Sequence, residues 1–403
     1  MEVPILSGPS LVKKSFLTQV VLNGLTILLF GLWNPSFIPF VCGIVLLATP
    51  GRPVREKAYS GWAKVFLCAV GVILTLIALF NFAVDPLWCF GHVNPWNMKQ
   101  AGFNERLLKT NLVTFGDFRY RSLLIGSSRV AVLNQNDFKG MDAFNYAAAT
   151  MVPEEYGEYI RYAAQRKGKG FENIIIGMDF FGSNGNYRKT FEPPDFYFDT
   201  AGSMLYRYRM LLAWDTLRYS MDNLRGGGGK VRGTYDRCNV RTPKPRTFEE
   251  RKRLVREQFI FFKTEGYGKN YRYDENLKEK LVRLKLDNPG ASFMVFTTPV
   301  SEPLFCLMIR MNRLPDYERW LRDLVQVFGR VWNFMDLNTV TRDHEHTFTD
   351  LDHVYPATGR LIAHRVLGIR DENVPPDFGK LVTRDNIDEI IAEVRSQCAE
   401  CGK

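Results

Sequence analysis

A pair of serines directly after a short apolar run carries the first residues able to do chemistry. Residues 122–126 read SLLIG, and Ser127, Ser128 and Arg129 follow. A serine at the end of a strand presents its hydroxyl at the rim of a sheet, and a helix beginning there offers backbone N–H groups to an oxyanion. Gly126 permits the sharp exit from such a strand. The same residue types also serve as a plain turn or helix cap.

A second polar motif lies near the other end of the chain, where Asp350, Leu351, Asp352 and His353 are consecutive. A histidine acts as a general base when a carboxylate fixes its tautomer. Asp350 is the expected partner, because three residues allow it to fold back across one turn. Asp352 is the less expected partner, because adjacent side chains usually point apart. The alternative is a structural histidine whose hydrogen bonds are satisfied in the core.

The elements between these motifs alternate between strand-like and helix-like patterns. A parallel sheet with helices on both faces is the architecture that such alternation predicts, and these sheets react at the carboxyl ends of their strands. The expected strands lie within residues 122–126, 143–147, 173–181, 292–298 and 331–337, and the expected helices include 153–167, 200–224, one opening with the capping box at 247–250, and 314–328.

This order of motifs resembles the SGNH (GDSL-like) hydrolase superfamily, in which the nucleophile block comes first and an Asp-x-x-His block last. Ser128 matches the nucleophile, because Gly126-Ser127-Ser128 stands where the family has Gly-Asp-Ser. The chain looks most like the membrane-anchored DltD-like envelope proteins. It is also similar to envelope proteins found with polysaccharide genes, which share the Gly-Ser-Ser-Arg and Phe-Asn-Tyr-Ala blocks. The resemblance covers roughly residues 85–368.

The resemblance implies a flavodoxin-like, five-stranded parallel sheet flanked by helices. It also implies a serine O-acyltransferase or esterase that uses Ser128, His353 and Asp350 on a cell-surface polysaccharide or another envelope polymer. The expected partners are a glycan or acyl-carrying substrate and a membrane-bound O-acyltransferase, and no cofactor or metal is expected. The implied location is the bacterial cytoplasmic membrane, with the catalytic domain on the periplasmic or extracellular side.

The chain departs from the family pattern in the blocks that would bind the substrate and the oxyanion. Backbone N–H groups near Ser128 and Ala148 are expected to hold the oxyanion. The candidates that remain around the nucleophile are Gly126, Ser127, Arg129, Asn145, Asp179 and Asn184. The third family block has no asparagine at the matching place, and Asn184 is a possible substitute. Loss of such a donor costs on the order of 100-fold in rate, which leaves a non-catalytic, glycan-binding scaffold as the alternative.

Arg129 has two possible roles, either binding an anionic substrate or pairing with Asp179 or Asp336.

His344 and His346 have metal-ligand side chains, but zinc usually needs a third ligand, so a solvated loop is favoured. Cys398 and Cys401 have redox-like spacing at the C-terminus, and a structural or incidental pair is favoured over a catalytic one.

An N-terminal membrane anchor is predicted over residues 1–86. The uncharged run 65–84 has the length of a transmembrane helix, and the run at about 16–49 is expected to form a hairpin that turns near Asn34 and Pro35. A re-entrant hairpin and a cleaved signal peptide are the alternatives. Basic residues before and between the two runs place those segments in the cytoplasm, so residues 87–403 are exported.

The chain of 403 residues has 53 basic and 43 acidic side chains, a net charge of +10. Many of the cations lie in an insertion at about 200–256. Such a run of basic residues is usually a solvated face on a flexible surface loop, and the alternative is a surface that contacts lipid head groups or an anionic glycan. Nucleic acid is excluded as a partner if this domain is exported.

Overall fold

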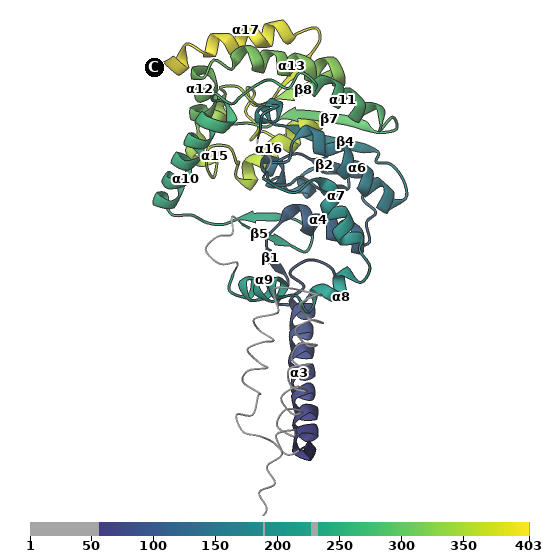
Figure 1. Ribbon diagram of the computed structural model, residues 1–403. Helices are drawn as coiled ribbons and strands as arrows, with labels where there is room; N and C mark the ends of the chain where they lie inside the picture. Colours follow the sequence, from purple (N-terminus) through teal and green to yellow (C-terminus); the bar gives the residue numbers. More distant parts are fainter. Residues whose placement is uncertain (1–55, 188–189, 227–232, 403) are drawn as a thin grey trace, which may run out of the picture. The chain divides into compact units, whose positions relative to one another are not determined.

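The computed structural model describes residues 56–187, 190–226 and 233–402 (Figure 1). These residues form two compact units. One contains residues 56–86, 94–97 and 204–226, and the other contains 87–93, 98–187, 190–203 and 233–402. The expected hairpin at 16–49 lies outside the described residues.

The larger unit is built on a six-stranded sheet in the order β3-β2-β4-β7-β8-β9. The first five strands are parallel, and β9 pairs with β8 in the antiparallel sense. The expected mixed α/β class with a parallel sheet is confirmed, but five strands were predicted and β9 was not. The bounds are β2 Ser122–Ile125, β3 Ala143–Asn145, β4 Asn173–Met178, β7 Ser292–Thr297, β8 Arg330–Asn333 and β9 Lys380–Thr383.

Both faces of the sheet are buried, which explains why its central strands are apolar at consecutive positions. Ile174 and Ile176 of β4 pack into one hydrophobic cluster, whereas Ile175 between them packs into another on the opposite face. This alternation follows from the two-residue period of a strand. Helices α6 (Pro153–Lys167), α11 (Leu277–Leu286) and α13 (Leu314–Phe328) contribute to the first cluster, and α16 (Pro356–Leu367) contributes to the second.

A small antiparallel sheet accompanies the main one and consists of β1 (Lys99–Ala101), β5 (Gly233–Asp236) and β6 (Arg241–Pro243). Helix α10 (Phe248–Phe261) follows it and begins at the predicted capping box. The hydroxyl of Thr247 accepts from the N–H of Glu250, and the carboxylate of Glu250 accepts from the N–H of Thr247. Cys401 forms a disulfide with Cys306 of α12 (Glu302–Arg310), so it does not pair with Cys398.

The smaller unit contains helix α3 (Glu56–Val84). Its segment Ala63–Val84 is 22 residues long with a mean hydropathy of 2.6. At 1.5 Å per residue this segment is about 33 Å long, which matches the hydrocarbon core of a bilayer. The helix is therefore long and apolar enough to cross a membrane.

The single long helix expected over residues 200–224 is wrong. The structure has three shorter helices there: α7 (Pro194–Gly202), α8 (Tyr206–Met210) and α9 (Trp214–Leu224). Leu205 adopts a left-handed backbone conformation with φ 59°, which a continuous α-helix does not accommodate. Residues 204–226 belong to the same compact unit as α3, whereas α7 belongs to the larger unit.

Candidate active site

The nucleophile candidate lies at the carboxyl end of β2, where the chain turns into the short helix α5 (Ser128–Ala131). Ser127 caps this helix, because its hydroxyl accepts from the N–H of Arg129 at 3.2 Å. Gly126 has φ +157°, and a Cβ atom there would lie 2.4 Å from Cγ2 of Val130 and 2.7 Å from the carbonyl oxygen of Gly177. Only glycine fits this position, so Gly126 allows the chain to leave the strand and orient Ser128.

The two distant motifs meet at this point. The Oγ atom of Ser128 lies 2.8 Å from Nε2 of His353. On the other side of the ring, Nδ1 of His353 lies 2.9 Å and 3.1 Å from the carboxylate oxygens of Asp350. All of these distances are within hydrogen-bond reach. Ser128, His353 and Asp350 thus form a continuous hydrogen-bonded chain, in the arrangement that the sequence predicted.

A tight turn explains how Asp350 reaches the imidazole. The Oδ1 atom of Asp350 accepts from the backbone N–H groups of Asp352 and His353 at 3.1 Å and 2.9 Å. A carboxylate that bonds its own backbone two and three residues on folds the chain over itself. The turn therefore places the carboxylate beside the ring and fixes the orientation of both groups.

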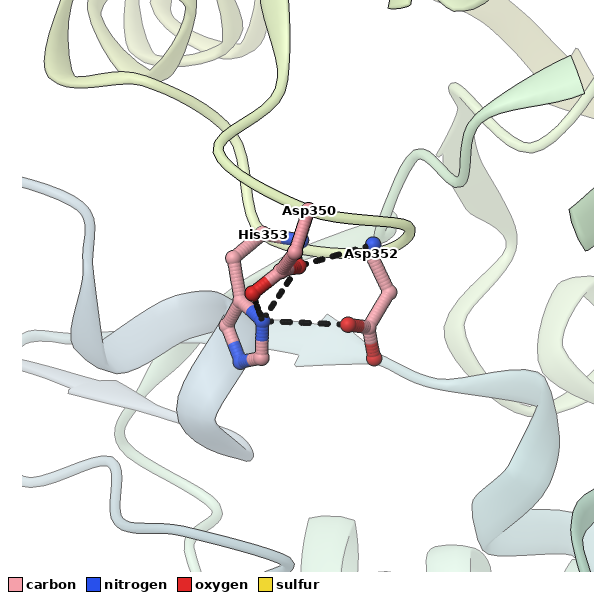
Figure 2. A group of neighbouring side chains, drawn as sticks. All are labelled: Asp350, Asp352 and His353. Carbon is pink, nitrogen blue, oxygen red and sulfur yellow. Dashed lines mark hydrogen bonds and ion pairs between the residues drawn. The ribbon is translucent and has the colours of Figure 1, made fainter. Parts of the chain in front are cut away.

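Asp352 also contacts His353, contrary to expectation. Its Oδ1 lies 3.0 Å from Nδ1 of His353, and Figure 2 shows both carboxylates facing the same ring nitrogen, with Nε2 on the far edge of the imidazole. The turn at Asp350 bends the backbone enough to bring in this second carboxylate. Two further side chains hold Asp352: Arg129 donates through Nε at 3.0 Å, and Gln258 donates through Nε2 at 3.0 Å.

The electrostatics of this group favour a protonated imidazole. Burial of His353 disfavours the charged ring, but the carboxylates of Asp350 and Asp352 outweigh this effect and raise the pKa of His353 to about 10. The pKa of Asp352 is lowered, because the charges of His353 and Arg129 outweigh the effect of burial. The two carboxylates are thus arranged to stabilise the imidazolium that forms when His353 accepts a proton.

Arg129 lies beneath the site and is not open to a substrate. Its side chain is only 2% exposed and pairs with Asp352 and, at 3.4 Å, with Asp179. The rings of Phe181 and Phe262 lie 5.1 Å and 5.6 Å from its guanidinium carbon. Of the two roles considered, pairing with Asp179 is present, whereas Asp336 pairs with Lys380.

Three of the expected oxyanion donors are engaged elsewhere. The N–H of Ala148 donates to the carbonyl of Gly126 at 3.2 Å. The amide of Asn145 donates to the carbonyls of Val130 and Leu133 at 2.9 Å each. These bonds hold the end of α5 and the residues that follow it. The side chain of Asn184 donates to the carbonyl of Glu265 and accepts from the N–H groups of Asn186 and Arg272. These residues are structural, because their polar groups already have partners.

Other backbone amides are better placed. Ser128 is the first residue of α5, so its N–H has no partner within the helix. Among residues 147–150, the N–H groups of the first three have partners, and that of Thr150 has none within the described part of the chain. Thr150 has a left-handed backbone with φ 51°, and both Thr150 and Ser128 line the same cavity.

This cavity has a volume of about 300 Å³ and opens over the serine and the histidine. Its wall combines aromatic rings with one face of α10, whose Gln258 also accepts from the N–H of Leu351 at 3.0 Å. No sequence pattern indicated Thr150 or the cavity face of α10, because only the tertiary fold brings them here, and Asp352 was the less expected of the two carboxylate partners. The lining residues are Ser128, Thr150, Phe181, Tyr187, Leu254, Glu257, Gln258, Phe261, Phe262, Asp352 and His353.

The ligand-type atoms of Asp350, Asp352 and His353 lie within 4.8 Å of one another, and no other such group occurs in the described residues. A divalent cation here would lie beside Arg129, and beside Arg246, whose Nη1 is 3.6 Å from Asp350. These guanidinium groups already compensate the carboxylates. His346 instead contacts Asp343 at 2.6 Å in an exposed turn. Asp350, Asp352 and His353 thus form a charge-paired histidine rather than a set of metal ligands.

No protein-family model and no curated protein matches the chain.

Proposed function

We propose that the protein is a membrane-anchored serine O-acyltransferase or esterase of the SGNH type, which acts on a cell-surface polysaccharide or another envelope polymer. The observation that carries this proposal is the hydrogen-bonded chain from Ser128 through His353 to Asp350. A serine, a histidine and a carboxylate in this relation are the groups that nucleophilic acyl transfer requires.

In the proposed reaction, the Oγ atom of Ser128 attacks the carbonyl carbon of an acyl donor, and its proton moves to Nε2 of His353. The imidazolium is stabilised by Asp350 and Asp352. Collapse of the tetrahedral intermediate breaks the bond to the leaving oxygen, which takes the proton from His353. A glycan hydroxyl or water then attacks the acyl-Ser128 ester and gives its proton to His353. When the bond between the acyl carbon and Oγ breaks, His353 returns this proton to Ser128 and the acylated product or free acid leaves.

The backbone N–H groups of Ser128 and Thr150 are the proposed oxyanion donors. Both residues line the cavity, and neither amide has a partner within the described chain. Fixed donors of this kind are effective because they do not reorganise during the reaction. The bonds that hold the preceding loop support this role: Lys109 donates to the carbonyl of Ala147 at 2.6 Å, and Glu105 accepts from the N–H of Ala149 at 2.8 Å.

The proposed location is a bacterial cytoplasmic membrane that α3 crosses, with the larger unit on the outer side. The basic residues that precede α3 in the sequence favour this orientation under the positive-inside rule. The disulfide between Cys306 and Cys401 suits an oxidising compartment. A membrane-bound O-acyltransferase that supplies the acyl group is the expected partner.

The test is labelling of the full-length protein with a fluorophosphonate probe, which reacts with activated serines. Ser128→Ala is expected to abolish labelling. Ser127→Ala is the matched control: it removes the helix cap and costs about 1 kcal/mol of stability, but it retains labelling. Equal labelling of the wild type and Ser128→Ala would reject the proposal.

A non-catalytic, glycan-binding scaffold is the second candidate. The observation that favours it is that Asn184, the only substitute identified for the missing third-block asparagine, is held by other residues. Absence of labelling in folded wild-type protein from pH 7 to 10, together with retained glycan binding, would favour the scaffold.

A further inference from the structure

We propose that residues 94–97 and 204–226, here called the collar, lie in the head-group layer of the bilayer that α3 crosses. The collar includes α8 and α9 and belongs to the same compact unit as α3. The inference rests on the proposed membrane anchor and does not depend on the chemistry at Ser128. The partner proposed for the collar is the surface of a phospholipid bilayer.

Hydrogen bonds attach the collar to the last turn of α3. Asn81, which is 1% exposed, accepts from the hydroxyl of Ser220 at 2.8 Å and donates to the carbonyl of Leu211 at 2.9 Å. Asn94 donates to the carbonyl of Ala83 at 2.8 Å. These contacts join both segments of the collar to the same end of α3.

The position of Asn81 fixes the depth of the collar. It lies within the apolar segment Ala63–Val84, three residues before the end. Three residues of an α-helix correspond to about 4.5 Å along its axis. If α3 spans the membrane, the groups bonded to Asn81 must therefore lie close to the boundary between hydrocarbon and head groups. A polar side chain at this depth requires such partners, since lipid tails supply none.

The outer side chains of the collar suit the same boundary. Met204 is 83% exposed, Leu205 is 60% exposed and Trp96 is 56% exposed, although all three are large and apolar. Tyr208 and Leu224 are about half exposed. Tryptophan and tyrosine are enriched where membranes meet water. A head-group layer would cover these side chains, which otherwise remain in contact with water.

The charges of the collar favour phosphate groups. Residues 204–226 contain four arginines and two aspartates. Arg207, Arg209, Arg218 and Arg225 are the four cations, and one of them, Arg218, lies 3.7 Å from Asp215. At the surface of a bilayer, arginine side chains keep their charged ends in the polar layer, and aromatic rings lie at the level of the head groups.

The experiment places a photoreactive benzophenone amino acid at single positions of the full-length protein in phosphatidylglycerol-containing vesicles. Position 204 tests the collar, and position 79 in α3 reports the membrane span. Position 286 in α11 is the control, because Leu286 is 71% exposed but belongs to the other unit. Lipid adducts are measured by mass spectrometry.

Adducts at positions 79 and 204, with none at 286, are the expected result. Adducts at 79 but none at 204 would overturn the collar and leave the anchor intact. Absence of adducts at both positions would overturn the collar together with the membrane anchor. A peptide adduct between position 204 and residues 1–55 would also overturn it, because the occupant would then be the chain itself. Labelling of Ser128 by the fluorophosphonate probe tests the chemistry independently.

Discussion

Asp352 lies beside the ring nitrogen of His353 that Asp350 also contacts, with 3.0 Å between Oδ1 and Nδ1. This second carboxylate changes what the site is expected to do. One carboxylate is enough to orient an imidazole, and a second adds charge that favours the imidazolium. Because both carboxylates and the ring are buried, their interaction is screened little by water.

The first prediction concerns the pH dependence of labelling at Ser128. Only unprotonated His353 accepts the proton of the serine, so labelling should rise about tenfold per pH unit below the pKa of about 10. Asp352→Asn removes one of the two carboxylates, which lowers this pKa and moves the rising limb to lower pH. The measurement is the fluorophosphonate labelling rate from pH 6 to 11.

Asp343→Asn is the control for this shift. Asp343 also contacts a histidine, His346, but in an exposed turn, so the labelling profile should match that of the wild type. A profile of Asp352→Asn that coincides with the wild type would contradict the role assigned to the second carboxylate.

The second prediction concerns Gln258, which ties α10 to the His353 turn. Its side chain donates to Asp352 and accepts from the N–H of Leu351, each at 3.0 Å. Gln258→Leu keeps a similar volume but removes both bonds, which frees the turn that orients His353. Small errors in such positioning cost up to about 100-fold in rate, so we expect labelling to slow by tenfold or more.

Arg253→Leu is the matched variant on the same helix, since the side chain of Arg253 is 75% exposed. It should label at the wild-type rate. The thermal unfolding midpoint of both variants separates a positioning effect from loss of the fold. If Gln258→Leu labels normally, α10 is only a wall of the cavity.

The third prediction is that Gly126→Ala destabilises the larger unit. The added methyl group would lie 2.4 Å from Cγ2 of Val130 and 2.7 Å from the backbone oxygen of Gly177, at φ +157°. Overpacking of a buried position costs typically 1–3 kcal/mol, and the carbonyl cannot move without disturbing β4. Gly170→Ala is the control, because nothing lies within 4 Å of its added methyl group. Urea unfolding should show a lower midpoint for Gly126→Ala alone.

The sequence predicted the three residues at the centre of the site because each belongs to a local pattern. Ser128 directly follows a strand and a glycine, and His353 lies three residues after Asp350. Parallel strands end at one edge of a sheet, so these two patterns were expected to meet. Where the two motifs meet depends on the direction of the strands and not on the packing of side chains.

The remaining features depend on contacts that no local pattern reveals. Gln258 reaches Asp352 across 94 positions of the sequence. Asn145 and Asn184 are polar residues near the expected blocks, but their side chains bond to backbone groups that only the folded chain brings beside them. The break at Leu205 requires a left-handed residue, and leucine gives no signal for that conformation.

The last prediction concerns the disulfide between Cys306 and Cys401, which are separated by 95 positions. Cross-linking a loop of that length restricts the unfolded chain and is worth roughly 2–5 kcal/mol. Cys401→Ser should therefore lower the unfolding midpoint in urea, and a reducing agent should lower that of the wild type to a similar extent. Cys398→Ser is the control, because Cys398 is a free thiol, and the unfolding midpoint of this variant should remain sensitive to reduction.

An unfolding midpoint of the wild type that does not respond to reduction, in protein purified from an oxidising compartment, would show that this cross-link does not form. It would also remove one of the two observations that support the proposed location of the larger unit.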